Sequence, residues 1–145
     1  MRGMWIGHYA AAAVIFGAMD FVWLTIIALP LYEAELGDLM ADSPNMVAAI
    51  AFYAIYIGGI TYFATTPAVL AGSARRALVP GAVLGFVAYA TWDLTNLAVI
   101  EGFPASIVAA DLMWGAFVTA STAGLTYAVS RRIPALHPSA DQAGS

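Results

Sequence analysis

Four long apolar segments constrain the fold of this chain more than any other feature of its sequence. They cover residues 5–29, 46–66, 79–100 and 105–130. Each approaches the ~20 apolar residues that a helix needs to cross a hydrocarbon layer about 30 Å thick. Inside lipid, only helices and closed barrels satisfy all of their backbone hydrogen bonds, and segments of this length form helices. The sequence therefore predicts four transmembrane helices.

The composition agrees with a protein that lies in a lipid bilayer. Only 10% of the residues are charged and 62% are hydrophobic, whereas a soluble domain carries about 25% charged residues. So few charges cannot cover a surface that faces water. We expect an all-α fold, a single four-helix transmembrane bundle formed by residues 1–132. Residues 133–145 are polar and contain two prolines, and we expect them to form a disordered cytoplasmic tail.

The basic residues predict how the bundle is oriented. The chain has no lysine, and its arginines precede the first segment, separate the second from the third, and follow the fourth: Arg2, Arg75, Arg76, Arg131 and Arg132. The two remaining connections contain neither lysine nor arginine. Because cytoplasmic loops are enriched in basic residues, both termini and the 67–78 connection are predicted to be cytoplasmic.

The two connections predicted to lie outside differ in length. Residues 30–45 carry four acidic side chains with apolar residues between them, which favours a solvated acidic loop or a short amphipathic helix. Their spacing does not match a calcium-binding EF-hand loop. The connection 101–104 is so short that the third and fourth helices are predicted to form an antiparallel hairpin.

Three carboxyl groups interrupt the apolar segments: Asp20, Asp93 and Asp111. Such groups are costly in a bilayer and usually face the bundle interior or a wet cavity. With a helix rise of about 1.5 Å per residue, all three lie roughly 9–14 Å below the outer boundary. They therefore predict one shared polar layer in the outer half of the bundle.

Each acid has a potential hydrogen-bond donor three residues further on, which lies on the same helix face. These donors, and tyrosines expected at similar depth, complete the set of candidate ligand- or proton-binding residues: Trp23, Asn96, Trp114, Tyr53, Tyr56 and Tyr89. Asp93 and Asn96 are expected to form its centre. An equally weighted alternative is that these groups only hold the helices together by hydrogen bonds.

Small residues predict where the helices approach most closely. Gly81 and Gly85 form a G-x-x-x-G pair on the third segment, and Gly115 on the fourth can provide a matching contact. Pairs of this kind let two helix backbones pack closely in a membrane. Tyr89 and Asp93 continue the same stripe. The stripe is therefore predicted to pack against a neighbouring helix and to direct Asp93 into the bundle.

Several kinds of chemistry are excluded or disfavoured. The chain has no cysteine, so disulfides and thiolate metal sites are excluded. His8 has no second intramembrane histidine or nearby acid, and a packing role is favoured for it. The sequence contains no Gly-rich phosphate loop or H-E-x-x-H motif, no serine triad and no basic stripe suited to nucleic acid. We expect no metal, no cofactor and no nucleic-acid partner, and we favour a protein without enzymatic activity.

The stretch Ala90–Ala98, ATWDLTNLA, resembles the central signature of the DUF2177 family of small bacterial membrane proteins. Shorter stretches are also similar to that family: MDFVWL from Met19, FYAIYIG from Phe52 and DLMWG from Asp111. Together they extend over all four segments. The resemblance implies a four-helix protein of the bacterial cytoplasmic (inner) membrane with no established activity. It also implies an association with the modification of membrane fatty acids.

Three functions fit these features. The first is binding of a lipid or small molecule in an acidic, aromatic pocket open toward the outer leaflet, as an accessory to membrane-lipid modification. The second is a proton-coupled transporter or permease subunit in which a carboxyl group titrates. Four helices are few for a transport path, so this function also requires an oligomer. The third is a structural or assembly subunit. The expected partners are the lipid bilayer and either a second copy of the chain or another membrane protein.

Overall fold

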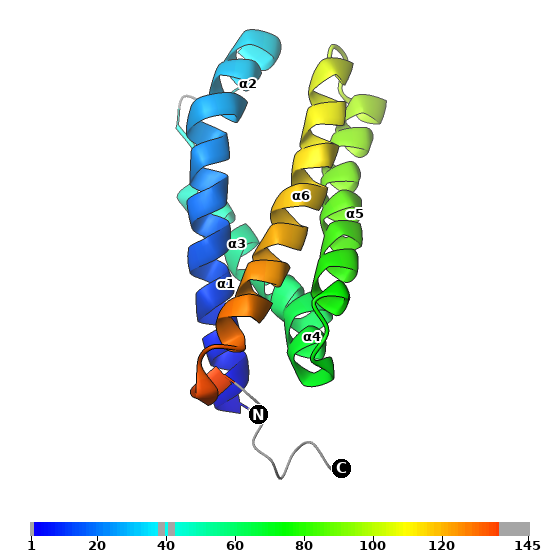
Figure 1. Ribbon diagram of the computed structural model, residues 1–145. Helices are drawn as coiled ribbons and strands as arrows, with labels where there is room; N and C mark the ends of the chain where they lie inside the picture. Colours follow the sequence, from blue (N-terminus) through cyan, green and yellow to red (C-terminus); the bar gives the residue numbers. More distant parts are fainter. Residues whose placement is uncertain (1, 38–39, 41–42, 137–145) are drawn as a thin grey trace.

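The computed structural model describes residues 2–37, 40 and 43–136. Throughout these residues the regular structure is helical (Figure 1). The helices of this part of the chain that are long and apolar enough to cross a membrane are Gly3–Leu36, Met46–Ala71, Arg75–Val99 and Ala105–Ser130. They confirm the predicted all-α fold with four membrane-spanning helices.

The first two crossing helices each contain a π-helical turn. In the first, α1 (Arg2–Trp23), the π turn η1 (Leu24–Ala28) and α2 (Leu29–Leu36) follow one another without a break. In the second, α3 (Met46–Ile60), the π turn η3 (Thr61–Thr65) and α4 (Thr66–Ala71) do the same. The third and fourth are α5 (Arg75–Val99) and α6 (Ala105–Ser130), and a short 3-10 turn, η4 (Pro134–Leu136), follows α6.

Pro30 does not end the first helix. The predicted loop from residue 30 is therefore wrong at its start, because the helix continues to Leu36. Proline lacks the N–H that would bond the carbonyl four residues earlier, and its ring crowds that carbonyl. The π turn just before it is closed by a bond from the Leu29 N–H to the carbonyl of Leu24, one residue further back than in an α-helix. A π bulge of this kind lets a helix adjust its hydrogen bonds locally and continue.

Pro67 stands in the same position after η3 as Pro30 does after η1. The N–H of Thr66 closes this second π turn at the carbonyl of Thr61. The predicted connection over residues 67–78 is wrong for the same reason, and only residues 72–74 separate α4 from α5. Gly72 reverses the chain there with a φ of 61°, a left-handed conformation that glycine adopts easily because it has no Cβ. α5 accordingly begins before residue 79, whereas α6 covers the residues predicted for the fourth span.

The glycine stripe of α5 lies directly against α6. A Cβ added at Gly85 would lie 1.9 Å from the carbonyl oxygen of Gly115, and one added at Gly81 would lie 3.0 Å from the Cα of Ala120. Tyr89 in turn covers Gly115, where an added Cβ would come within 2.3 Å of its ring. These contacts hold the backbones of α5 and α6 together without room for larger side chains.

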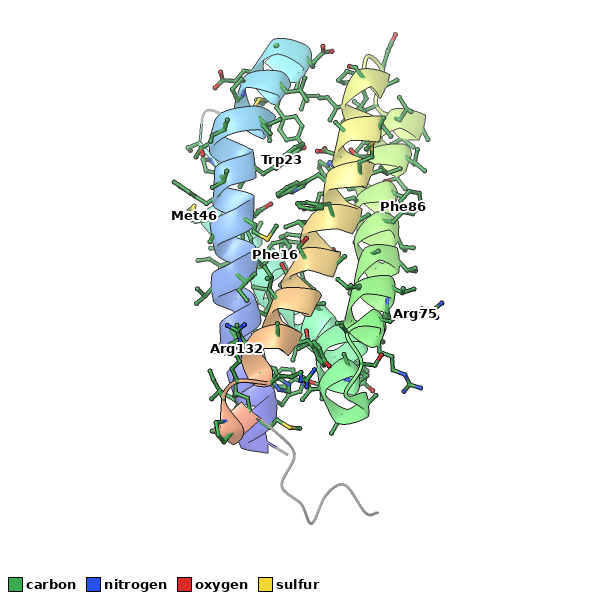
Figure 2. The ribbon with its side chains drawn as sticks, viewed as in Figure 1. Phe16, Trp23, Met46, Arg75, Phe86 and Arg132 are labelled. Atoms are coloured by element: carbon green, nitrogen blue, oxygen red, sulfur yellow. The ribbon has the colours of Figure 1, made fainter. Side chains whose placement is uncertain are left out.

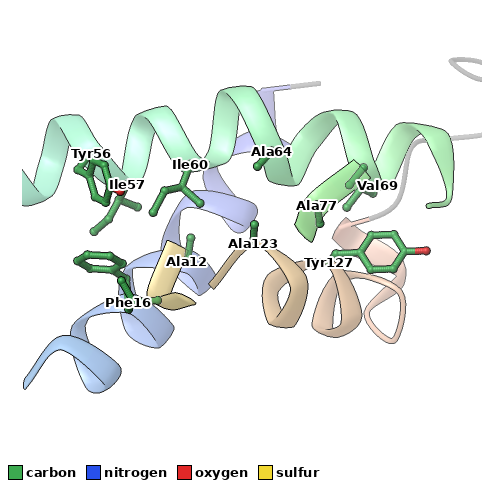
Figure 3. Packing of buried hydrophobic residues seen from close by; sticks show 12 residues of the cluster. Ala12, Phe16, Tyr56, Ile57, Ile60, Ala64, Val69, Ala77, Ala123 and Tyr127 are labelled. Carbon is green, nitrogen blue, oxygen red and sulfur yellow. The ribbon is translucent and has the colours of Figure 1, made fainter. Parts of the chain in front are cut away.

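The two halves of the bundle separate toward one end. The first helix and the α5–α6 pair approach each other at the end that holds the chain termini and diverge toward the opposite end (Figure 1). We call these the termini end and the far end. α5 packs against η3 and α4 but hardly touches α3. The buried apolar cluster therefore lies mainly toward the termini end, where Phe16, Ile60 and Ala123 are fully buried (Figure 3).

Charged side chains divide between the two ends. The arginine side chains that the structure describes are exposed at the termini end: Arg75, Arg76, Arg131 and Arg132 (Figure 2). Glu33, Glu35 and Glu101 are exposed at the far end. The far end is thus acidic and the termini end basic.

The chain after α6 folds back onto α1. His8 is fully buried, and its Nε2 donates to the carbonyl oxygen of Leu136 at 3.0 Å. Its Nδ1 lies 3.1 Å from the hydroxyl oxygen of Thr66. The prediction of a disordered tail is therefore wrong for residues 134–136, and residues 137–145 lie outside the described part of the chain. These contacts give His8 a packing role.

Replacement of Gly85 by alanine should weaken the bundle, because the new Cβ would overlap the backbone of Gly115. Overpacking of this kind typically destabilises by about 1–3 kcal/mol. The measurement is detergent-induced unfolding of the purified protein. Gly17→Ala is the matched control, because a Cβ at Gly17 meets nothing within 4 Å. Equal stability of the two variants would show that α5 and α6 do not pack as described.

Candidate functional site

A cavity of about 650 Å³ lies in the half of the bundle nearer the far end. Its lining includes two acids, three tyrosines and a tryptophan that come from five different elements: Asp20, Asp111, Tyr32, Tyr53, Tyr89 and Trp23. The cavity occupies the region where α3 and α5 have separated and large aromatic side chains reach inward. Figure 2 shows Trp23 between the first helix and α6, on the far-end side of Phe16. The structure thus brings together most of the residues that the sequence singled out.

Asp20 joins three helices at one side of the cavity. The hydroxyl of Tyr53 on α3 donates to one of its carboxyl oxygens, Oδ2. The indole Nε1 of Trp114 on α6 donates to the other oxygen, Oδ1, at 3.5 Å. Trp114 also stacks on Trp23, with ring centroids 4.5 Å apart and ring planes 5° from parallel. The predicted pairings within each helix are therefore wrong: Trp114, expected to bond Asp111, donates to Asp20, and Trp23, expected to bond Asp20, contributes its ring face to the stack with Trp114.

Asp111 also lines the cavity and is bonded by Tyr32. The Tyr32 hydroxyl donates to Asp111 Oδ2. Asp111 is only 2% exposed, and its Oδ1 has no hydrogen-bond partner within the described residues. The sequence does not predict a role for Tyr32, because the loop predicted to begin at Pro30 includes it. The absence of any second helix-breaking residue before Gly37 was the available signal that the helix continues.

Asp93 and Asn96 do not line the cavity, although both were expected at its centre. Asp93 is fully buried on α5, one turn beyond Tyr89 toward the far end. Neither of its carboxyl oxygens, nor the amide nitrogen of Asn96, has a partner among the described residues. Asp93 is close enough to Asp111 for their charges to interact. The Tyr32 hydroxyl is likewise close enough to interact electrostatically with all three acids. The three acids are therefore near one another, but Asp93 is buried and does not line the open space.

The remaining aromatic residues form the inner limit and the lateral opening of the cavity. Tyr56 is buried beyond its lining, and its hydroxyl shares a 2.7 Å hydrogen bond with the hydroxyl of Thr119. Trp92 and Phe52 line the cavity and are 63% and 46% exposed. Because these two side chains lie on the outer surface of a membrane-spanning bundle, the cavity opens sideways between α3 and α5.

A row of buried hydroxyl groups continues from Tyr56 toward the termini end. After Thr119, it consists of fully buried threonines on η3 and α6 whose hydroxyls have no partner within the described residues: Thr61, Thr65, Thr122 and Thr126. Ser130, at the end of α6, donates to the carbonyl oxygen of Thr126 at 2.8 Å. Buried polar groups without partners are uncommon in proteins. The row of hydroxyl groups between η3 and α6 is therefore more polar than the apolar cluster beside it.

The chemistry available in the cavity is that of carboxyl groups, phenols and aromatic faces. Thr91 and Thr95 also line it, but their hydroxyls donate to carbonyl oxygens of their own helix. None of the lining residues is basic. The described residues contain no group of three or more His, Asp or Glu side chains placed to hold a metal ion.

The chain matches the model of a family described as predicted membrane protein (DUF2177) over residues 5–128. The match extends over most of the chain, and the protein therefore belongs to the DUF2177 family. No curated protein and no solved structure matches it.

A double-mutant cycle should detect the hydrogen bond between Tyr32 and Asp111. Tyr32→Phe removes the donor, and Asp111→Leu replaces the carboxyl with an apolar group of similar shape. Interhelical hydrogen bonds in membranes contribute about 0.6–2 kcal/mol, and we expect a coupling free energy of unfolding in this range. Tyr62→Phe is the control partner for Asp111→Leu, because Tyr62 is 66% exposed; that pair should be additive. Additivity in both cycles would mean that α2 does not reach α6.

Proposed function

We propose that this member of the DUF2177 family binds an amphipathic, membrane-soluble molecule in the cavity between α1, α3 and α5. The observation that carries the proposal is the combination of buried acids with exposed aromatic side chains in one cavity. Asp111 and Asp20 are nearly fully buried at its inner side, whereas Trp92 and Phe52 are exposed at its lateral opening. A ligand that entered from the bilayer would meet apolar surface first and polar groups last.

The size and composition of the cavity support this proposal. Cavities that bind small molecules measure about 300–1,000 Å³ and combine a mostly apolar lining with a few polar groups that fix the ligand's orientation. The volume of about 650 Å³ lies within this range. Binding of a membrane lipid would suit an accessory role in the modification of membrane lipids.

A purely structural role explains only part of the polar layer. The bonds of Asp20 with Tyr53 and of Asp111 with Tyr32 do connect separate helices. However, Asp93 is buried without a hydrogen bond to any described residue, so it does not hold helices together in this way. A structural role also does not require a laterally open cavity beside the bonded groups.

Proton-coupled transport is a second candidate, and the row of buried hydroxyls favours it. Threonines and Ser130 extend this row along α6 from the cavity to the termini end. Hydroxyl groups and intervening water can relay protons between titratable groups. Vesicles that contain the protein and a pH-sensitive dye distinguish this candidate from binding alone: a proton path requires a dye response to an imposed pH gradient, and Thr122→Val should slow that response.

We also propose that the termini end faces the cytoplasm, because the described arginines are exposed there and basic residues are enriched on that side. The chain has no cysteine, so single substitutions can report the orientation. On intact cells, a membrane-impermeant maleimide should label Glu101→Cys, and it should label Ser73→Cys only after the membrane is opened. The reverse pattern would contradict this orientation and would place the cavity nearer the inner leaflet.

Binding can be tested by fluorescence quenching in vesicles of digalactosyldiacylglycerol, an uncharged lipid, with octadecanol brominated in the middle of its chain as the probe. The Trp5→Phe/Trp92→Phe variant leaves the stacked pair Trp23 and Trp114 as reporters. Quenching should saturate with probe concentration, whereas a variant that retains only Trp5 should respond linearly because it senses bulk lipid. Ala88→Phe fills the cavity wall and should weaken the saturable component about tenfold.

Ala98→Phe is the matched control for Ala88→Phe, because Ala98 is exposed on the same helix. It should leave the saturable quenching unchanged. Quenching of the stacked tryptophans that never saturates, or that Ala88→Phe does not alter, would refute the binding function.

A further inference from the structure

The charged groups around the cavity are all of one sign. Its lining contains two carboxyl groups and no basic side chain. The described arginines are exposed at the opposite end of the bundle, and the exposed acids at the far end are Glu33, Glu35 and Glu101. Acidic groups arranged in this way raise the local concentration of cations and repel anions.

Asp111 retains an unused acceptor in this setting. The residue lines the cavity and is 2% exposed. Its Oδ2 accepts from Tyr32, but its Oδ1 has no partner among the described residues. A buried carboxyl oxygen without a donor is costly, and a positive charge held in the adjoining cavity would stabilise the carboxylate.

Aromatic rings surround the same space. Trp23, Tyr32 and Tyr89 line the cavity from three different elements. The negative faces of such rings attract cations, and aromatic cages with a nearby acid are a common means of binding ammonium groups. The carboxyl groups and the aromatic rings thus both favour a positive charge on a ligand.

Other ligand groups fit less well. A phosphate or carboxylate headgroup would find no basic side chain in the lining. A metal ion would find no group of three His, Asp or Glu ligands in the part of the chain that the structure describes. A neutral hydroxyl could bond Asp111 but would supply no positive charge to balance the acids.

We propose that the inner side of the cavity recognises an ammonium group, so that the ligand is a cationic amphipath whose apolar chain leaves between α3 and α5. This inference rests on the proposed binding function and specifies the chemical class of its ligand. The ammonium group lies beside the carboxylate of Asp111 and against the aromatic rings. The apolar chain runs past Phe52 and Trp92 into the bilayer.

The test compares three probes with the same brominated octadecyl chain: a trimethylammonium, an alcohol and a sulfate. Each is added to vesicles of digalactosyldiacylglycerol, an uncharged lipid without an ammonium group, that contain the Trp5→Phe/Trp92→Phe protein. Saturable quenching should occur at a concentration at least tenfold lower for the trimethylammonium than for the alcohol, and the sulfate should bind most weakly. Partition of each probe into protein-free vesicles corrects for its concentration in the membrane.

Two substitutions identify the source of this preference. Asp111→Asn keeps an acceptor for Tyr32 but removes the charge, and it should reduce the preference for trimethylammonium over alcohol by about tenfold while alcohol binding changes little. Glu101→Gln removes an exposed acid at the same end of the bundle and should leave the preference intact.

The possible outcomes separate this inference from the binding function. Saturable quenching by all three probes with similar affinity would overturn the inference and leave the binding function in place. Absence of saturable quenching by any probe would overturn both. A preference that Asp111→Asn leaves unchanged would overturn the assignment to Asp111.

Discussion

The close contact between α5 and α6 is the constraint on which the rest of the bundle depends. At Gly85 the two backbones are so near that no side chain fits between them. Helices in lipid gain little from the hydrophobic effect and associate instead through close packing and hydrogen bonds. Because α5 and α6 are joined in this way, the pair diverges as one unit from the first helix toward the far end. The resulting space is wide enough for stacked indoles and phenols, and its unfilled part is the cavity.

The two π turns determine which side chains reach this space. Because the first helix continues through η1 and past Pro30 as α2, Tyr32 reaches Asp111 on α6. η3 makes the same adjustment before Pro67, and the second helix continues to Ala71. Both prolines thus occur inside helices because each backbone widens by one residue immediately before the ring. Leu24, the first residue of η1, itself lines the cavity, so the irregular turn is also part of its wall.

The sequence predicted the number of crossing helices, the bounds of α6 and the glycine contact, because each depends on local composition and helical spacing. It also placed Asp20, Tyr53 and Trp114 in one polar layer, since their depths in the bilayer follow from helix rise, but it paired Trp114 with Asp111 instead of Asp20. The prediction failed at Pro30 and Pro67, because the helix continues past each of these prolines. It also placed Asp93 at the centre of the cavity, because residues on one stripe were assumed to face one space. Whether a residue of this stripe lines the cavity depends on how the separate helices pack together, and no single segment contains that information.

The energetics of the polar layer favour a ligand over simple helix association. Removing a carboxyl group from water costs several kcal/mol unless hydrogen bonds or an opposite charge offset the loss. Tyr53 and Tyr32 offset part of it for Asp20 and Asp111, but no described residue does so for Asp93. Apolar residues of similar volume would hold the same helices together at lower free energy. A positive charge bound in the cavity would act on all three acids, since they lie within electrostatic range of Tyr32. The same bound charge would therefore stabilise the bundle and explain why its acids are gathered near the cavity.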